Sequence, residues 1–208
     1  MSRFLNSKYR ELEAYVPGEQ PTDMKYIKLN TNESPYPPSQ RVLDAVNSAE
    51  VAKLNLYSDP TCRSLKSAVA ELFGKKSENI FLSNGSDDIL NFSFMAFCDG
   101  GAAYADITYG FYPVFAELYG VNSKIIPLKD DLTLDVGEFC RTDAACVIAN
   151  PNAPTGLAIS LADVERIVSA NENRVVVVDE AYVDFGGESA VSLTEKYKNL
   201  LVCMTYSK

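Results

Sequence analysis

Short apolar runs alternate along the chain with longer segments in which apolar residues recur every three or four positions. The clearest run is four consecutive valines at 175–178, with no polar position between them. An unbroken β-branched run is typical of a strand buried on both faces, as in a parallel sheet. Similar runs predict further strands at residues 80–82, 102–107, 123–128, 144–149 and 200–204.

The segments between these runs have the spacing of amphipathic helices. Ser160 followed by Asp163 resembles a capping box, which marks the start of a helix. Strand–helix alternation of this kind predicts an α/β fold, a three-layer sandwich with helices on both faces of a mostly parallel central sheet. The predicted helices span residues 39–49, 62–73, 87–98, 109–119 and 160–170.

Composition narrows the function classes. The 208 residues carry a net charge of −9, which argues against binding to nucleic acid or to an anionic membrane. The absence of histidine removes the commonest metal ligand and general base, so we expect no metal site, and acid–base chemistry from Lys, Tyr, Asp, Glu or a cofactor. Five cysteines without CxxC spacing, and no apolar run of transmembrane length, indicate a cytoplasmic protein.

Carboxylates end the valine run, because Asp179 and Glu180 follow it directly. The carboxyl ends of strands are where open α/β sheets bind ligands. The alternative is that Asp179 only caps the next turn, and by itself the run favours neither interpretation.

Two further features have the chemistry of a ligand site. The turn Asn84-Gly85-Ser86, between a predicted strand and helix, offers backbone amides to a phosphate, although many such turns bind nothing. Thr205, Ser207 and Lys208 follow the last predicted strand, and they can bind a phosphate and form a Schiff base. With Asp179 for a ring nitrogen, these features predict a pyridoxal phosphate site. A nucleotide site is disfavoured, since neither GxGxxG nor GxxxxGK[ST] occurs.

Distinct motifs are spread along the whole chain, namely YVPG, KLNTNESPYPPS, YSDP, SNGSDD, TYGFY, NPNAPTG, DEAYVDF and TYSK. Together they resemble the motifs of the fold type I aminotransferases. The YVPG and LNTNESPYPPS segments resemble the histidinol-phosphate branch in particular.

The resemblance implies three catalytic residues. Lys208 would bind pyridoxal phosphate covalently and carry the proton to and from the substrate α-carbon. Asp179 would pair with the pyridine nitrogen and keep it protonated, and Tyr182 would donate a hydrogen bond to the phenolic oxygen.

The resemblance also implies cofactor contacts. Tyr109 would stack on the ring, unless it is a core aromatic residue. Many relatives have asparagine where this chain has Ala153, so either Asn152 replaces that contact to the phenolic oxygen or Tyr182 makes it alone. The phosphate would be held by the backbone amides of Gly85, Ser86 and Asp87 and the hydroxyls of Thr205 and Ser207.

A neighbouring subunit enters the implied site. Its Tyr57 would reach the cofactor phosphate, which makes the protein a homodimer with shared active sites, unless Tyr57 packs locally. Tyr15, Asn32 and Glu33 would lie near the substrate, or else make contacts within the arm and its loop.

The implied reaction is amino transfer between histidinol phosphate and 2-oxoglutarate in histidine biosynthesis. An aromatic aminotransferase, a threonine-phosphate decarboxylase and a non-catalytic interaction module stay open. The resemblance implies an arm or small-domain segment at 1–30 and a cofactor-binding large domain at 31–208. Because no arginine matches the expected phosphate and substrate positions, we expect this domain to be incomplete and a C-terminal small domain to lie outside the chain.

Overall fold

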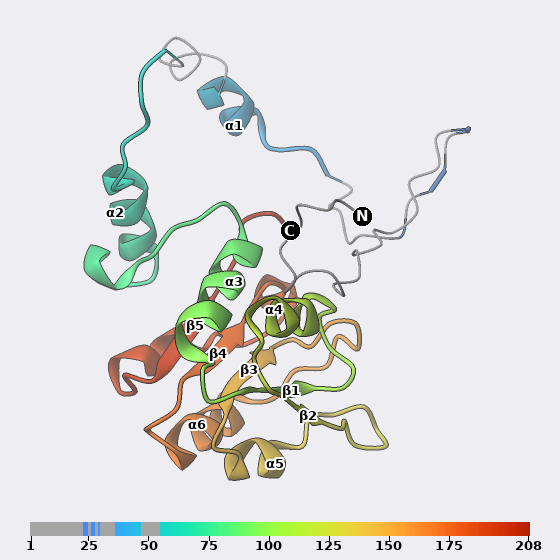
Figure 1. Ribbon diagram of the computed structural model, residues 1–208. Coiled ribbons are helices and arrows are strands. Elements are labelled where there is room, and N and C mark those ends of the chain that lie inside the picture. The colour runs from blue at the N-terminus through green and yellow to red at the C-terminus, as the bar shows by residue number, and fades with distance from the viewer. Residues whose placement is uncertain (1–22, 25, 28, 30–35, 47–54) are drawn as a thin grey trace, which may run out of the picture. The chain divides into compact units, whose positions relative to one another are not determined.

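The computed structural model describes residues 23, 24, 26, 27, 29, 36–46 and 55–208 (Figure 1). The chain forms two compact units. One is Ser83–Ser207, and the other contains the described residues before Ser83 together with Lys208. The predicted substrate residues Tyr15, Asn32 and Glu33 lie outside the described residues.

The unit Ser83–Ser207 is built on a five-stranded sheet of order β2-β1-β3-β4-β5, in which every neighbouring pair is parallel. Val176–Val178 of the valine run form β4 together with Asp179, between β3 and β5, and all four residues of this strand are buried. The predicted parallel sheet is therefore confirmed. Its strands are β1 (Ala102–Ala105), β2 (Ser123–Ile126), β3 (Ala145–Ala149), β4 (Val176–Asp179) and β5 (Leu200–Cys203).

Helices cover both faces of this sheet, which explains the unbroken apolar run (Figure 1). Val177 packs in one core with α3 (Ser86–Phe97) and α4 (Phe111–Tyr119). Val176 and Val178 point the other way, into a second core with α6 (Leu161–Ala170) and α5 (Val136–Arg141). Successive strand residues alternate between faces, so a strand with two covered faces needs apolar residues at every position. The three-layer prediction is thus confirmed.

Arg174, shortly before β4, is a charged residue inside this unit, with 4% of its surface exposed. Its guanidinium donates to the carbonyl oxygens of Phe139 (2.7 Å) and Ile167 (3.1 Å) and to the Cys146 sulfur (2.6 Å). Burial raises the pKa of Cys146 to about 12, although the nearby guanidinium charge acts in the opposite direction. Arg174 therefore ties α5 and α6 to the sheet through backbone acceptors.

The other unit contains α1 (Gln40–Ala45), α2 (Arg63–Leu72) and the 3₁₀ turn η4 (Ser77–Asn79). Asp59 lies in the turn before α2, and its carboxylate accepts hydrogen bonds from the backbone amides of Thr61 and Arg63, both at 2.9 Å. With the Thr61 hydroxyl, these bonds lower the pKa of Asp59 to about 2.

The strand predicted at 80–82 was wrong, because that segment is irregular. Phe81 is 66% exposed, so the run does not enter the sheet. The strand predicted at 123–128 ends at Ile126, since Pro127 has no amide proton to continue the ladder. The short helix α5 and the 3₁₀ turns η5 (Val183–Phe185) and η6 (Ala190–Glu195) were not predicted.

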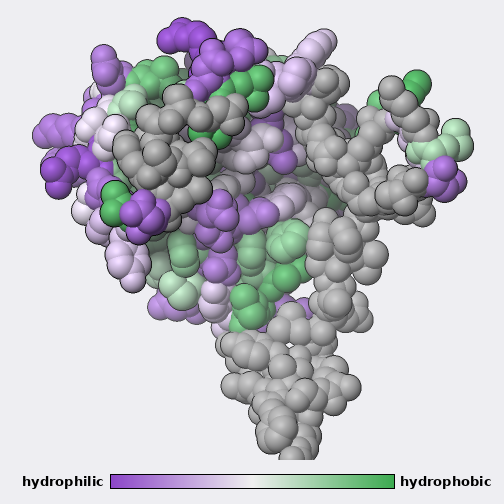
Figure 2. Space-filling view, turned by 90° about the horizontal axis from the view of Figure 1, so that it is seen from above, coloured by the Kyte–Doolittle hydropathy of each residue, from purple (hydrophilic) through white to green (hydrophobic). Residues whose placement is uncertain are grey.

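Apolar side chains also reach the surface, interspersed with polar ones on the face in Figure 2. On α3, Phe92, Met95 and Phe97 are 39–57% exposed. No helix in the described part of the chain is long and apolar enough to cross a membrane.

Candidate functional site

The parallel strands end together at one edge of the sheet. Asp179 pairs with Ala149 on one side and Cys203 on the other. The Asn150 amide donates to the Asp179 carbonyl oxygen at 2.9 Å, and the Glu180 amide donates to the Cys203 carbonyl oxygen at 2.7 Å. The loops that follow β3, β4 and β5 therefore begin side by side at this edge of the sheet.

Asp179 is 5% exposed, and the hydrogen bonds to its carboxylate include those from the Tyr112 hydroxyl and the Ala181 amide. The Ala181 amide donates to Oδ1 at 3.2 Å, so Asp179 does cap the following turn. The Tyr112 hydroxyl donates to Oδ2 at 2.7 Å, which joins α4 to β4. Burial, then the Asp179 charge, raise the pKa of Tyr112 well above its ordinary value, so the phenol keeps its proton.

Tyr109, whose ring contacts that of Tyr112, also meets Asp87. The Tyr109 hydroxyl donates to Asp87 Oδ1 at 2.8 Å. The half-buried Tyr109 ring stacks on Phe111 and meets the Tyr112 ring edge-on, with 5.6 Å between ring centroids. The structure thus brings together two predicted site residues from α3 and from the loop before α4.

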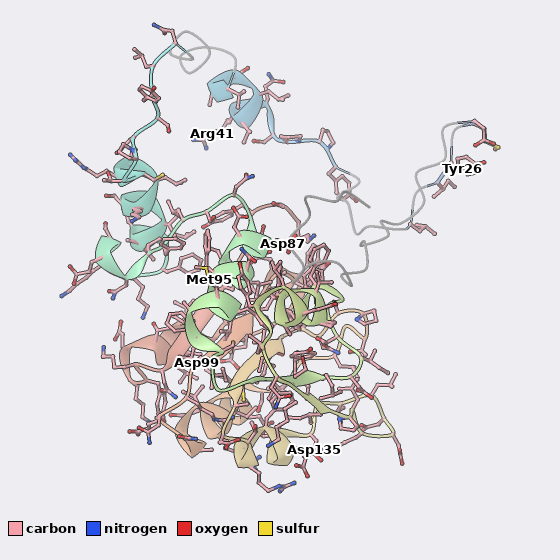
Figure 3. The ribbon with its side chains drawn as sticks, in the orientation of Figure 1. Tyr26, Arg41, Asp87, Met95, Asp99 and Asp135 are labelled. Carbon is pink, nitrogen blue, oxygen red and sulfur yellow. The ribbon has the colours of Figure 1, made fainter. Side chains whose placement is uncertain are left out.

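The N-terminus of α3 has the features of an anion site. Gly85 precedes the helix with φ +88° and ψ 172°, a conformation that favours glycine, and it provides no side-chain cap. Free amides and the helix dipole favour an anion at such an end. Asp87 lies at this end of α3, and Asp99 follows the other end (Figure 3).

The segment after β5 carries the predicted hydroxyls. The Thr205 hydroxyl donates to the Ser207 hydroxyl at 3.1 Å, and the Ser207 amide donates to Thr205 Oγ1 at 3.2 Å. Lys208 follows directly and is exposed, and Tyr57 is also exposed. Both belong to the other unit, so the structure leaves their place relative to Asp179 open.

Asn152 is buried and bonded to neighbouring loops. The Thr108 hydroxyl donates to its Oδ1 at 2.8 Å, and its Nδ2 donates to the Ile107 carbonyl oxygen (3.0 Å) and to Thr155 Oγ1 (3.3 Å). In this structure the amide thus joins the turn after β3 to the loop after β1. Tyr182 is half-buried, with its ring 6.3 Å from that of Phe185.

Two residues at the site edge were not assigned a role from the sequence, Tyr112 and Glu180. Tyr112 follows Tyr109 by three positions, and in the helix predicted at 109–119 this spacing would put both rings on one face, which was an available signal. In the structure Tyr109 lies in the loop before α4. Glu180 is 2% exposed and accepts hydrogen bonds from the Ser189 hydroxyl and the Ala190 amide, both at 2.6 Å.

Burial raises the pKa of Glu180 above its ordinary value of 4.5. The folded chain therefore binds the Glu180 proton more readily than the unfolded chain does. The contribution of this group to stability must therefore fall as pH rises from about 4.5, the ordinary pKa, past the raised pKa of the folded chain.

The arrangement offers two candidate binding elements in one unit, the N-terminus of α3 and a buried carboxylate at the end of β4. Among the residues that the structure describes, no group of three or more Cys, Asp or Glu is placed to hold a metal ion.

Parallel strands that end in a buried aspartate, beside a helix N-terminus, are consistent with a cofactor-dependent α/β enzyme. The family model described as "Aminotransferase class I and II" matches residues 24–208, and the chain belongs to this family.

Two curated relatives, the histidinol-phosphate aminotransferases of Clostridium acetobutylicum and Marinomonas sp., are each 52% identical to this chain, over 210 and 211 residues. Each match covers 100% of this chain and 60% of the relative, so the chain spans about 60% of their length. A solved structure, histidinol-phosphate aminotransferase from Sinorhizobium meliloti in complex with pyridoxal-5'-phosphate, matches with a TM-score of 0.76 and 26% identity. That match covers 86% of this chain and 51% of the other.

Proposed function

We propose that the protein is a pyridoxal-phosphate-dependent aminotransferase. Its reaction transfers an amino group between L-histidinol phosphate and 2-oxoglutarate, which gives imidazole acetol phosphate and glutamate in histidine biosynthesis. The observation that carries this proposal is the 52% identity, along the whole chain, to relatives named histidinol-phosphate aminotransferase.

The residues at the sheet edge fit this cofactor. The N-terminus of α3 suits a phosphate, and the Asp179 carboxylate suits a protonated ring nitrogen. When bound, pyridoxal phosphate supplies an aldehyde for amino groups and a ring that withdraws negative charge from the substrate α-carbon.

The chain's own residues would bind the cofactor, orient it and move the proton. Asp179 would keep the ring nitrogen protonated, and Tyr182 would donate to the phenolic oxygen. Asn152 would make that contact only by giving up one of its two Nδ2 hydrogen bonds, to the Ile107 carbonyl oxygen or to Thr155. Lys208 would hold the cofactor covalently through its aldehyde. Once the substrate amino group has displaced it, the freed Lys208 amine would take the proton from the α-carbon, since this chain has no histidine to act as a base. The phosphate contacts come from the backbone amides of Gly85, Ser86 and Asp87 and from the hydroxyls of Thr205 and Ser207. Tyr109 stacks on the cofactor ring.

The remaining predictions belong to the same proposal. Tyr57 of a second copy contacts the cofactor phosphate, which makes the protein a homodimer, and the protein works in the cytoplasm. Tyr15, Asn32 and Glu33 lie near the substrate. The division into an arm at 1–30 and a cofactor-binding domain from 31 onward stays a prediction.

A single-turnover experiment tests this proposal. The cofactor-loaded protein is mixed with histidinol phosphate, with phenylalanine or with threonine phosphate, and the cofactor absorbance is followed. We expect conversion to the amine form at least about tenfold more efficiently with histidinol phosphate than with phenylalanine. Faster conversion with phenylalanine would move the substrate assignment to an aromatic aminotransferase. Release of carbon dioxide from threonine phosphate would indicate the decarboxylase.

The covalent anchor is tested separately. After borohydride reduction, peptide mass spectrometry should find the cofactor on Lys208, and Lys208→Ala should abolish the adduct. If the protein binds no pyridoxal phosphate, it is not an enzyme of this class, and the interaction module becomes the better interpretation.

A further inference from the structure

The buried hydroxyl of Tyr112 contacts the carboxylate to which we assign the ring nitrogen. Tyr112 is the second residue of α4, is 0% exposed, and donates to Asp179 Oδ2 at 2.7 Å. The two residues are 67 positions apart, so the hydrogen bond is made by the fold and not by a local turn.

The aromatic core fixes the position of this hydroxyl. The Tyr112 ring lies 6.2 Å from Phe94 on α3, 5.9 Å from Tyr104 on β1 and 5.6 Å from Tyr109, measured between centroids. The contacts with Tyr104 and Tyr109 are edge-on. Because close-packed rings in a core cannot turn without displacing their neighbours, the direction of the hydroxyl is set by the helices and the sheet.

Two donors from different elements orient Asp179. Tyr112 approaches Oδ2 from α4, and the Ala181 amide approaches Oδ1 from the turn after β4. A carboxylate accepts about four hydrogen bonds, so it can accept from both donors and from a ring nitrogen as well. A hydrogen bond donated to a carboxylate also favours its charged form.

We propose that Tyr112 is a positioning residue, which holds the Asp179 carboxylate in the orientation and the charged state that bind the cofactor ring nitrogen. The inference rests on the proposed function. It assigns to Tyr112 no contact with the substrate or the cofactor, since Tyr112 acts through Asp179.

The neighbouring tyrosine extends this arrangement to the phosphate end. Tyr109 touches the Tyr112 ring edge-on and donates to Asp87 at the N-terminus of α3. One pair of aromatic rings thus joins the β4 carboxylate to the helix end that we assign to the phosphate. The distance between the two binding elements is therefore set by packed rings.

The test is Tyr112→Phe, which keeps the ring and removes the hydroxyl. Tyr104→Phe is the matched control, because Tyr104 is also buried, touches the Tyr112 ring, and donates to Ser123 at 2.7 Å instead of to Asp179. Two quantities are measured for both variants. One is the dissociation constant of pyridoxal phosphate, and the other is the chemical shift of its ¹⁵N-labelled ring nitrogen in the bound state. For Tyr112→Phe we expect about tenfold or more weaker binding, a displaced nitrogen signal, and a larger fall in kcat than rise in KM. Tyr104→Phe should leave all of these unchanged.

A double-mutant cycle with Asp179→Asn separates positioning from packing. If Tyr112 acts through Asp179, Tyr112→Phe should weaken cofactor binding by less than about twofold in the Asp179→Asn background. A similar loss in both backgrounds, or a similar loss in Tyr104→Phe, overturns the inference. 3-Fluorotyrosine at position 112, which retains the hydroxyl, should bind the cofactor as the parent does, and weakened binding would count against it.

The two proposals fail differently. If the parent protein binds no pyridoxal phosphate, the proposed function fails, and this inference fails with it. If the parent binds the cofactor and Tyr112→Phe binds it equally well with an unchanged nitrogen signal, this inference alone is wrong.

Discussion

The Asn152 side chain joins three points of the site edge, and its removal should cost measurable stability before any cofactor is added. Asn152→Ala deletes the hydrogen bonds with the Ile107 carbonyl oxygen, the Thr108 hydroxyl and the Thr155 hydroxyl. Asn152 is 3% exposed, while Ile107 and Thr108 reach water in part. At about 1 kcal/mol for each net hydrogen bond, we expect the free energy of unfolding to fall by about 2–3 kcal/mol.

Urea unfolding of the cofactor-free protein measures this loss. With a slope of roughly 2 kcal/mol per molar urea, the midpoint should fall by about 1–1.5 M. Asn122→Ala is the control, since Asn122 is exposed, and a surface substitution changes stability by about 0.5 kcal/mol or less. An Asn152→Ala midpoint equal to that of the parent would refute the reasoning, and would mean that these bonds contribute nothing net.

Three other substitutions test particular contacts by the same unfolding assay. Because ionisation of buried Glu180 costs stability as pH rises above about 4.5, Glu180→Gln should cost less stability at pH 8 than at pH 4, and an equal cost at both pH values would contradict this. Arg174→Lys keeps the charge but lacks the planar fork that reaches the Phe139 and Ile167 carbonyls, and it should lower the free energy of unfolding by about 2–4 kcal/mol. Ser160→Ala removes the acceptor of the Asp163 amide and should cost about 1 kcal/mol, and a variant as stable as the parent would contradict the cap.

The sheet was predictable because a strand that is buried on both faces needs an unbroken run of apolar residues, which can be read from the sequence. Every residue of β4 must be apolar up to the edge, and Asp179 marks where the sheet ends. The capping box at Ser160 and Asp163 was predictable for a similar reason, since both partners lie within one turn. Such features depend on neighbours in the sequence.

Pairings across the sheet were not predictable from one sequence. Nothing local to Tyr112 shows that its hydroxyl reaches Asp179, because that contact depends on how α4 packs against the sheet. The apolar segment 80–82 has the composition of a strand, but a strand also needs a neighbour with which to pair, and the local pattern does not contain this information.

The polar side chains at the site edge share one construction, in which each bonds to an element distant from its own. Asn150 accepts from the Ile159 amide at 2.9 Å, Glu180 binds Ser189, and Asp179 binds Tyr112. An unpaired buried polar group costs about 1–3 kcal/mol, so each loop loses stability if it moves away from its partner. The loops around the proposed site are therefore held by side chains anchored at the ends of buried strands. A substitution that removes only the polar group, such as Tyr112→Phe, should loosen the site before it unfolds the sheet, because it leaves the apolar packing on both faces in place.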